Sequence, residues 1–240
     1  MNQFKEIDYL MLSPTGACNL QCKQCTRKNN SGSYKHGIEV IAKYFPNIKH
    51  VKLQGLGEPL LASNFVDLCK DLRKYFPEVN ILTITNGTFG FDYFKFSLKL
   101  FEINELYISI DSVKNDPNKK YDDIMTSLKV LNELAYSINL SVCINTTLYD
   151  YNSTTKELQE IINLLDEFIN IKGIRIQHHQ DWNDFSKIKY IDDSKIDDSI
   201  FLNPKVKFIG RDDFEFKDCL WNTKRVQINE EGNIKVCCLK

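Results

Sequence analysis

The sequence lacks an excess of charge of either sign, because 31 lysines and arginines stand against 32 aspartates and glutamates. Proteins that bind nucleic acids or anionic membranes usually carry basic segments, so we expect neither as a partner. Low-complexity tracts are also absent, and glycine and proline number only 10 and 6. With 42% hydrophobic residues in 240, the chain can bury a sizeable core.

No hydrophobic run approaches the ~18 residues of a membrane-spanning helix. The first residues, from Met1 to Glu6, lack the charged start and apolar centre of a secretion signal. We therefore expect a cytoplasmic protein. In that compartment its eight cysteines indicate metal ligation rather than a disulfide framework.

Six of the eight cysteines form two groups, one towards each end of the chain. The first group is Cys18, Cys22 and Cys25, and the second is Cys219, Cys237 and Cys238. The first group has the spacing C-x3-C-x2-C and follows an apolar run. Three clustered thiolates bind a soft metal or an iron–sulfur cluster and leave one position open for a non-protein ligand. A structural zinc site is the alternative, although a fourth ligand is not close in the sequence.

Strand and helix patterns alternate along the first three quarters of the chain. Strands are predicted at 8–13, 49–54, 80–85, 105–111, 140–147 and 174–178. Helices are predicted at 35–45, 64–75, 90–102, 119–136 and 158–169, the last opened by the capping box Thr154-Thr-Lys-Glu157. These six strand–helix repeats predict an α/β fold with parallel strands and right-handed crossovers.

The predicted strands have one apolar and one polar face. In the third strand, Leu82 and Ile84 are expected on the apolar face, opposite Thr83 and Thr85. A parallel sheet covered by helices on both sides would be apolar on both faces. A partial (β/α)6 barrel explains the pattern, because its polar face turns inward and its functional residues lie at the carboxyl ends of the strands.

Three segments are expected along the chain. Residues 1–180 form the barrel domain, and residues 181–218, rich in Asp, Lys and Ser, form a linker or loose helix. Residues 219–240 form a small cysteine-containing extension. Its core is a predicted β-hairpin of residues 226–229 and 234–236, joined by a Glu-Glu-Gly-Asn turn.

The order of the motifs resembles the radical S-adenosylmethionine (SAM) superfamily. The C-x3-C-x2-C loop is followed by the segment Leu53–Pro59, which is similar to the family's Gly-Gly-Glu segment with Leu-Gly-Glu in its place. Thr85-Asn86-Gly87 matches the Thr-Asn-Gly found after the third strand. Ser109-x-Asp111 resembles the segment around the SAM ribose and carboxylate. Gln24 departs from the family, which often has an aromatic residue before the third cysteine.

This resemblance implies a radical SAM enzyme with a [4Fe-4S] cluster on Cys18, Cys22 and Cys25. The residues it implies as SAM contacts are Gly55, Gly57, Glu58, Asn86, Ser109, Asp111, Asn145 and Arg175. An electron from a donor such as flavodoxin or ferredoxin would cleave SAM to a 5′-deoxyadenosyl radical, which takes a hydrogen atom from the substrate. Arg175, Gln177 and His179 are also candidates for lining the substrate pocket.

The C-terminal cysteines resemble the opening of a SPASM/twitch auxiliary-cluster domain. Cys219 is followed by twelve residues, Gly232, four residues and Cys237. The resemblance implies a second iron–sulfur cluster, with Cys219, Cys237 and Cys238 as candidate ligands. That domain continues with further cysteines, whereas this sequence stops at Lys240, so the segment is expected to be incomplete.

Three functions stay open at this point. The first is a radical SAM oxidoreductase that oxidises or remodels a small polar metabolite, with Cys143 as a hydrogen donor or pocket-lining residue. The second is the crosslinking or epimerisation of a ribosomally made peptide, although a leader-binding module is not expected in the few residues before the first strand. The third is a non-catalytic zinc-binding protein.

Overall fold

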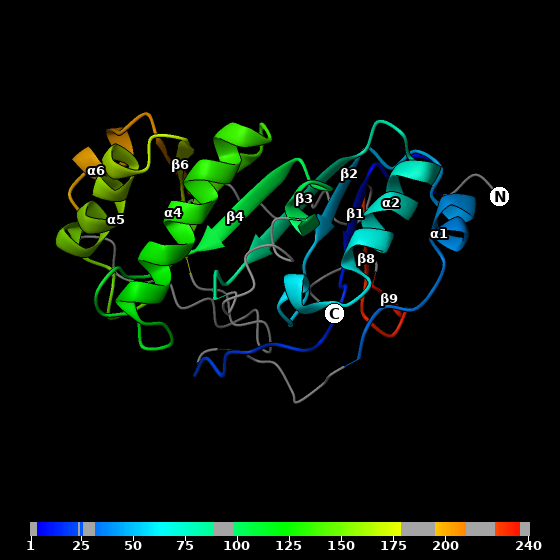
Figure 1. Ribbon diagram of the computed structural model, residues 1–240, viewed down its shortest axis with the longest axis horizontal. Coiled ribbons are helices and arrows are strands. Elements are labelled where there is room, and N and C mark those ends of the chain that lie inside the picture. The colour runs from blue at the N-terminus through cyan, green and yellow to red at the C-terminus, as the bar shows by residue number, and fades with distance from the viewer. Residues whose placement is uncertain are drawn as a thin grey trace. The chain divides into compact units, whose positions relative to one another are not determined.

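The computed structural model describes residues 4–23, 25, 32–88, 98–178, 195–209 and 224–235. The chain divides into two compact units, whose elements are coloured along the chain in Figure 1. The first unit comprises Met1–Ile84, Phe94–Glu105 and Glu215–Lys240. The second comprises Thr85–Tyr93 and Leu106–Phe214.

The first unit is built on strands in the order β3-β2-β1-β8-β9. These are β1 (Tyr9–Leu12), β2 (His50–Leu53), β3 (Asn80–Thr85), β8 (Arg225–Ile228) and β9 (Ile234–Lys235). β1 pairs in parallel with both β2 and β8, whereas β9 is antiparallel to β8. Because β1 and β2 are parallel neighbours, the loops that follow them begin at the same edge of the sheet.

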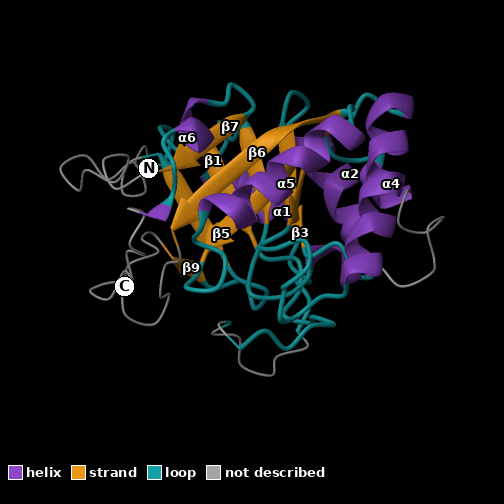
Figure 2. Ribbon diagram, turned by 90° about the vertical axis from the view of Figure 1, so that its left-hand side faces the viewer, coloured by secondary structure: helices purple, strands orange, loops and turns teal. Residues whose placement is uncertain are grey.

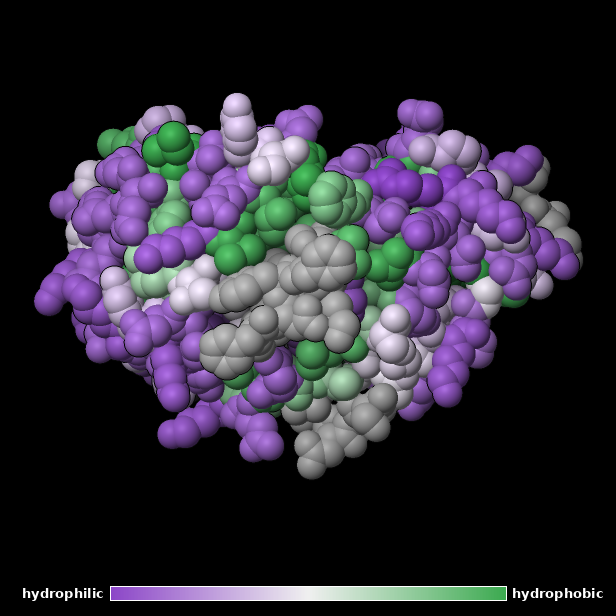
Figure 3. Space-filling view, viewed as in Figure 1, coloured by the Kyte–Doolittle hydropathy of each residue, from purple (hydrophilic) through white to green (hydrophobic). Residues whose placement is uncertain are grey.

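The helices of the first unit are α1 (Ile38–Tyr44), α2 (Phe65–Tyr75) and the short 3₁₀ helix η1 (Pro59–Leu61). α2 buries Phe65, Leu68, Cys69 and Leu72, which share one face of a helix with 3.6 residues per turn. Mostly hydrophilic side chains cover the surface over α1 and α2 (Figure 3). None of the helices in the described ranges combines the length and apolarity that crossing a bilayer requires.

The second unit is built on strands in the order β7-β6-β5-β4. These are β4 (Glu105–Ser109), β5 (Ser141–Leu148), β6 (Ile171–His178) and β7 (Val206–Ile209). The helices are α4 (Tyr121–Ser137), α5 (Thr155–Glu167) and α6 (Ser199–Leu202). α4 packs on β5 and β6, α5 packs on β6 (Figure 2), and α6 packs on β7.

The capping box predicted before α5 is present in one half only. The side chain of Thr154 accepts a hydrogen bond from the Glu157 N–H at 3.3 Å, as predicted. The Glu157 carboxylate does not complete the box. It accepts hydrogen bonds from the Ser112 hydroxyl at 2.8 Å and the Asn115 amide at 2.7 Å. Glu157 therefore fixes the loop after β4 to the first turn of α5.

The face predicted for the third strand is wrong. Ile81, Thr83 and Thr85 are at most 1% exposed, whereas Leu82 is half-buried and Ile84, although buried, is 9% exposed. The Thr83 hydroxyl donates a hydrogen bond to the Leu53 carbonyl at 2.7 Å. A hydroxyl that has a hydrogen-bond partner can be buried at little cost. The face that carries Thr83 is therefore the more buried one, although the pattern assigned the core to the face of Leu82 and Ile84. In β4, β5 and β6 the apolar residues are buried as predicted.

In the described part of the chain, three strands, β7, β8 and β9, extend the sheets beyond the six predicted for the barrel. In the segment 181–218, predicted as a linker or loose helix, the described residues 195–209 contain α6 and β7, and β7 pairs in parallel with β6. The predicted C-terminal hairpin is confirmed as β8 and β9, but β8 also pairs with β1. The boundaries at residues 180 and 218 stay a prediction. Of the helix predicted at 90–102, only residues 98–102 are described, and 98–100 are helical.

Candidate functional site

The cysteine loop begins at Ser13, directly after β1. Cys18 and Cys22 are half-buried and Cys25 is exposed. The Cys25 N–H donates to the Cys22 carbonyl at 3.0 Å, which closes a tight turn between the two. The Leu20 N–H points to the Cys18 sulfur at 3.5 Å. The thiols therefore follow one another around a single short loop.

The first half of this loop is held by backbone hydrogen bonds to residues 32–34. The Gly16 N–H donates to the Gly32 carbonyl at 2.7 Å, and the Tyr34 N–H donates to the Pro14 carbonyl at 2.9 Å. The Thr15 hydroxyl also donates to Gly32 at 2.9 Å and accepts from the Ala17 N–H at 3.1 Å. These bonds fix the chain up to the residue before Cys18.

The turn after β2 contacts the same loop. The Glu58 N–H donates to the Ala17 carbonyl at 2.7 Å. A Cβ atom at Gly57 would lie 2.3 Å from the Thr15 carbonyl oxygen and 2.6 Å from that of Ala17. Gly55 lies similarly close to the Ser13 side chain. Only glycine permits such close backbone approach, which explains the Gly-x-Gly-Glu spacing physically.

Glu58 is 4% exposed, and its carboxylate accepts a hydrogen bond from the Leu60 N–H at 3.1 Å, capping η1. The Lys99 ammonium donates to the carbonyls of Leu60 and Ala62, the latter at 3.0 Å. Burial lowers the pKa of Lys99, and the negative charge of Glu58 partly opposes that shift. The Glu58 carboxylate is thus oriented by η1, with a cation nearby.

The three thiols fit a cluster that has three protein ligands. Within the described ranges, no three His, Cys, Asp or Glu side chains converge so as to hold a single metal ion. Three thiolates in one short loop are a donor set that suits an iron–sulfur cluster with one position left to a non-protein ligand. Such a cluster would use Cys18, Cys22 and Cys25.

In the second unit, Asp111 joins the ends of β4 and β5. It is half-buried, and its carboxylate accepts a hydrogen bond from the Thr147 N–H at 2.8 Å. Burial raises the pKa of Asp111 to about 6, although Lys119 and the Thr147 hydrogen bond act in the opposite direction. The Asn152 amide donates to the carbonyls of Asp111 at 2.5 Å and Thr147 at 2.9 Å. Asp111 therefore also links β4 to β5 through its hydrogen bond with Thr147, besides its predicted contact with SAM.

Ser109 and Asn86 also make local contacts. The Ser109 carbonyl accepts a hydrogen bond from the Lys119 ammonium. The Asn86 side-chain oxygen accepts from the Thr88 N–H at 2.8 Å and the Thr88 hydroxyl at 2.7 Å. These bonds shape the turn after β3. The SAM contacts of Ser109 and Asn86 stay a prediction.

Arg175 on β6 is oriented by residues from two neighbouring strands. Its Nε donates to the Asn145 side-chain oxygen on β5 at 2.8 Å. Its guanidinium carbon lies 4.9 Å from the centre of the Tyr107 ring on β4. Cys143 is half-buried and shares this strand face with Asn145, two residues away on β5. The structure thus brings Asn145 and Arg175 together on the polar face predicted from the sequence.

Several predicted residues lie outside the described residues. These are Gln24, His179, Cys219, Cys237 and Cys238. Gly232, which belongs to the auxiliary-cluster motif, lies in the hairpin turn with φ of 85°. A Cβ atom there would lie 2.4 Å from the His36 ring, whose Nε2 is 2.9 Å from the Glu231 carbonyl. The positive φ angle and the close approach of His36 are therefore sufficient to explain why residue 232 is a glycine.

Sequence reasoning missed Lys99, Lys119 and Gln54. Lys99 bonds to residues 39 and 37 positions away, which no local pattern reveals. Lys119 was expected only as part of a helix. Gln54, at the end of β2, has a buried side-chain oxygen without a hydrogen-bond partner in the described part of the chain. The only feature of the sequence that could have pointed to Gln54 is its position directly before the glycine turn.

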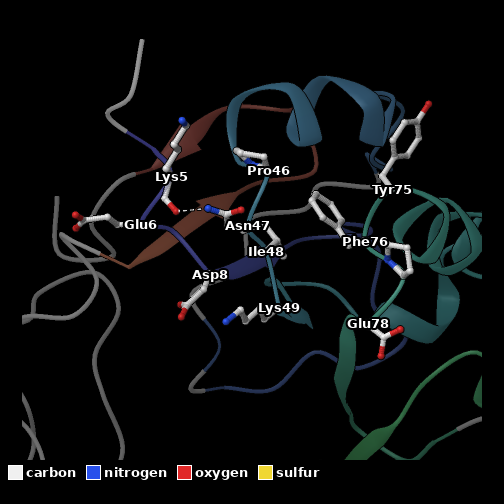
Figure 4. A pocket seen from close by; sticks show the side chains of 11 residues that line it. Lys5, Glu6, Asp8, Pro46, Asn47, Ile48, Lys49, Tyr75, Phe76 and Glu78 are labelled. Atoms are coloured by element: carbon white, nitrogen blue, oxygen red, sulfur yellow. Dashed lines mark hydrogen bonds between the residues drawn. The ribbon is translucent and has the colours of Figure 1, made fainter.

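A hollow of about 510 Å³ lies at the other edge of the first unit's sheet (Figure 4). It is lined by residues before β1, β2 and β3, and Figure 4 shows the Asn47 amide donating to the Lys5 carbonyl at 2.7 Å. Lysines and carboxylates, among them Lys49 and Glu78, share its wall. Sites in this type of fold lie at the carboxyl ends of strands, so we assign no chemistry to this hollow.

Residues 12–174 match the radical SAM superfamily. The chain belongs to this superfamily. GTP 3′,8-cyclase of Clostridium perfringens strain 13 is 30% identical over 269 residues, which cover 97% of this chain and 81% of the cyclase. A probable GTP 3′,8-cyclase of Methanocaldococcus jannaschii is 25% identical over 98% of this chain and 86% of its own length.

The structure of Streptococcus suis SuiB bound to its precursor peptide SuiA is similar over 99% of this chain, with a TM-score of 0.73. Sequence identity is 15%, and the chain spans 60% of the length of SuiB. This likeness shows the fold, the α/β partial barrel predicted from the sequence.

The radical SAM enzyme predicted from the sequence is confirmed, and the zinc-binding alternative is set aside. Membership implies a [4Fe-4S] cluster, SAM, a substrate and a reductant. The SPASM/twitch subgroup and the oxidoreductase class stay predictions.

Proposed function

We propose that this enzyme binds its cluster on Cys18, Cys22 and Cys25 and remodels a small polar metabolite by hydrogen-atom abstraction. The hydrogen bond from the Glu58 N–H to the Ala17 carbonyl carries the proposal. It holds the turn after β2 next to the cysteine loop. A small chelating molecule would fill the one ligand position of the cluster that the three cysteines leave open. When bound, the cluster and SAM supply the one-electron cleavage that generates the hydrogen-abstracting radical.

The proposed SAM contacts fall into two groups, one in each unit. Gly55, Gly57 and Glu58 belong to the first unit, and Asn86, Ser109, Asp111, Asn145 and Arg175 belong to the second. The turn residues would offer backbone groups and one carboxylate. The strand-end residues would offer amide, hydroxyl, carboxylate and guanidinium groups. Each group by itself offers hydrogen-bonding partners of the kind that amine, carboxylate or ribose groups require.

GTP is the first substrate to test, because the two relatives described above are named GTP 3′,8-cyclases and match almost the whole chain. The polar face of the second unit supports a polar substrate, since Arg175, Asn145 and Gln177 all present hydrogen-bonding groups there. Cys143 is proposed as a hydrogen donor or pocket-lining residue on the same face. The SuiB likeness concerns fold alone, so it does not favour peptide modification.

The test is anaerobic reconstitution with iron and sulfide, reduction with dithionite, and measurement of 5′-deoxyadenosine. Wild-type protein is expected to form it, and Cys22→Ala is expected to abolish it. No cleavage by the reduced, cluster-loaded wild type would reject the proposal. Consumption of GTP in proportion to 5′-deoxyadenosine would support GTP as the substrate, whereas cleavage with GTP unchanged would exclude it.

A second cluster on Cys219, Cys237 and Cys238 is the remaining part of the proposal. The confirmed hairpin supports it, because β8 and β9 fall between Cys219 and Cys237 as the resemblance implies. Iron analysis of a variant with Cys18, Cys22 and Cys25 all replaced by alanine tests it. Residual iron that disappears when Cys237 is also replaced would support a second cluster, and iron-free protein would reject it.

A further inference from the structure

Gln54 carries a hydrogen-bond acceptor that the folded chain leaves unused. Its side-chain oxygen is buried and has no hydrogen-bond partner in the described part of the chain. Burial takes the oxygen out of water, so the missing bond costs the fold stability. Buried polar atoms in folded proteins usually have a partner, and an exception indicates either a strained position or a group that a ligand satisfies.

The pairing of β2 with β1 shows where the Gln54 side chain lies. The Gln54 N–H donates to the Leu12 carbonyl at 3.0 Å, which continues the parallel ladder one residue beyond Leu53. Side chains alternate along a strand, so Gln54 shares a face with the half-buried Lys52. Leu53, at 0% exposed, lies in the core on the other face. The amide therefore stands at the carboxyl edge of the sheet, on the face that carries Lys52.

The polar groups next to Gln54 are used by the cysteine loop. Ser13 is its neighbour on β1 in the continued register, and the Ser13 hydroxyl is directed to the Thr15 carbonyl at 3.5 Å. In the turn that follows, the Glu58 N–H donates to the Ala17 carbonyl. These groups hold the loop in place and leave the Gln54 oxygen without a donor. A molecule bound beside the loop would supply one.

The chemistry of Gln54 and Lys52 limits what that molecule presents. A primary amide has an acceptor oxygen and two N–H donors, and it can turn either towards a partner. A hydroxyl group both donates and accepts, so it pairs with the amide in both orientations. Lys52 lies two residues away, about 7 Å along the strand, and its positive charge disfavours a second cation nearby. The arrangement therefore favours a neutral hydroxyl over a protonated amine.

We propose that Gln54 is a substrate-binding residue that hydrogen-bonds a hydroxyl group of a sugar-like or nucleoside-like substrate. This inference rests on the proposed function, because it names a residue that binds the small polar metabolite. The proposed SAM contacts of this unit, Gly55, Gly57 and Glu58, belong to the turn beyond the sheet, whereas Gln54 stands on the face of the sheet itself. The substrate supplies the bond that the ligand-free enzyme lacks.

The deciding variant is Gln54→Met, which keeps the length of the side chain and removes the amide. Its matched control is Gln159→Met, the same change at an exposed glutamine of α5. Melting temperatures are measured on the reconstituted enzymes without SAM or substrate. Gln54→Met is expected to melt about 2–4 °C higher than wild type, because it removes a buried polar atom that has no partner. The control is expected to melt with wild type. A residue that only supports the fold would lower the melting temperature when replaced.

Equilibrium binding then identifies the ligand, with GTP and SAM as the two probes. The dissociation constant for GTP is expected to rise roughly tenfold in Gln54→Met, the usual effect of losing one hydrogen bond to a ligand. The dissociation constant for SAM is expected to equal that of wild type. If Gln54→Met loads iron poorly, Gln54→Asn decides by the same two affinities, because it withdraws the amide by one methylene group.

Each contrary result has its own meaning. A melting temperature of Gln54→Met that does not rise would overturn the proposal, because the oxygen would then already be satisfied. Weaker SAM binding would overturn the assignment to the substrate, and unchanged affinities for both probes would overturn any role in binding. No SAM cleavage by wild type would reject the proposed function itself. If wild type does not bind GTP, the melting temperature and SAM affinity of Gln54→Met decide alone: a higher melting temperature with unchanged SAM affinity supports the proposal.

Discussion

The Glu58 N–H and the Ala17 carbonyl oxygen are joined by a hydrogen bond of 2.7 Å. This bond links the turn after β2 to the cysteine loop after β1, two loops that leave the same edge of a parallel sheet. Both partners are backbone atoms. The position of the cysteines therefore depends on how closely the two backbones approach, and that closeness is decided at Gly57.

Gly57→Ala is expected to displace the cysteine loop without unfolding the protein. The added methyl group would lie 2.3 Å from the Thr15 carbonyl oxygen, so the two segments must separate. A displacement of about 1 Å at a reacting centre lowers rates by roughly 100-fold, and we expect a loss of this order in SAM cleavage. Leu56→Ala in the same turn, whose side chain is 49% exposed, is the control. Normal iron content and normal cleavage in Gly57→Ala would contradict the argument.

Glu58→Gln is expected to destabilise the protein mainly through Lys99. The glutamine oxygen can still accept from the Leu60 N–H, but the negative charge that opposes the desolvation of the half-buried Lys99 ammonium is lost. We expect a loss of up to about 1 kcal/mol in the free energy of unfolding at pH 7, because solvent screens the exposed part of Lys99. Denaturant titration of the variant and of Glu58→Gln with Lys99→Met measures it. The double variant should recover stability, and failure to recover would mean that Lys99 is not the cause.

The pH dependence of Glu58→Gln gives a second check. Burial already lowers the pKa of Lys99 below 10.5, and removal of the Glu58 charge lowers it further. Between the folded and unfolded pKa values the unfolded chain binds more protons, so the stability of the fold rises with pH in that window. The deficit of the variant relative to wild type should therefore shrink as the pH rises towards 10.5. A constant deficit would contradict the assignment.

Asp111→Asn is expected to remove a loss of stability that wild type shows as the pH rises from about 4 to about 6. The pKa of Asp111 rises from 3.8 to about 6 in the folded protein. Between these values the folded chain binds more protons than the unfolded chain, so wild-type stability falls as the pH rises. A shift of this size corresponds to a change on the order of 3 kcal/mol, complete above about pH 6. Unfolding curves at pH 4 to 7 for both proteins test it, and parallel curves would refute it.

Much of this fold could be predicted from local patterns. The apolar spacing of α2 and α5 and the alternation in β4, β5 and β6 are local properties, and the structure confirms them. The face of β3 was wrong because Thr83 satisfies its hydroxyl on the Leu53 carbonyl, a partner 30 residues away. The pairing of β8 with β1 could not be predicted either, since more than 200 residues separate the two strands.

The candidate site, like the fold, could be predicted from the sequence only in part. Cysteine spacing and the glycine turn are visible in the sequence, because close backbone approach requires glycine at Gly57. The contacts of Lys99 and Lys119 depend on which loops the fold brings together, so the sequence gives no sign of them. Asp111 was predicted as a ligand residue, yet the structure shows that it also fixes β4 to β5 through Thr147.

Arg175→Lys is expected to weaken SAM binding although it keeps the charge. Lysine lacks the planar group that lies over Tyr107 and donates to Asn145, so its ammonium is not held in place. We expect roughly a tenfold rise in the dissociation constant for SAM, equivalent to about 1.4 kcal/mol. Equilibrium binding measures this, with Lys172→Met as the control, because Lys172 is exposed on the same strand. An unchanged SAM affinity together with a raised substrate KM would instead assign Arg175 to the substrate, and no change in either would exclude both roles.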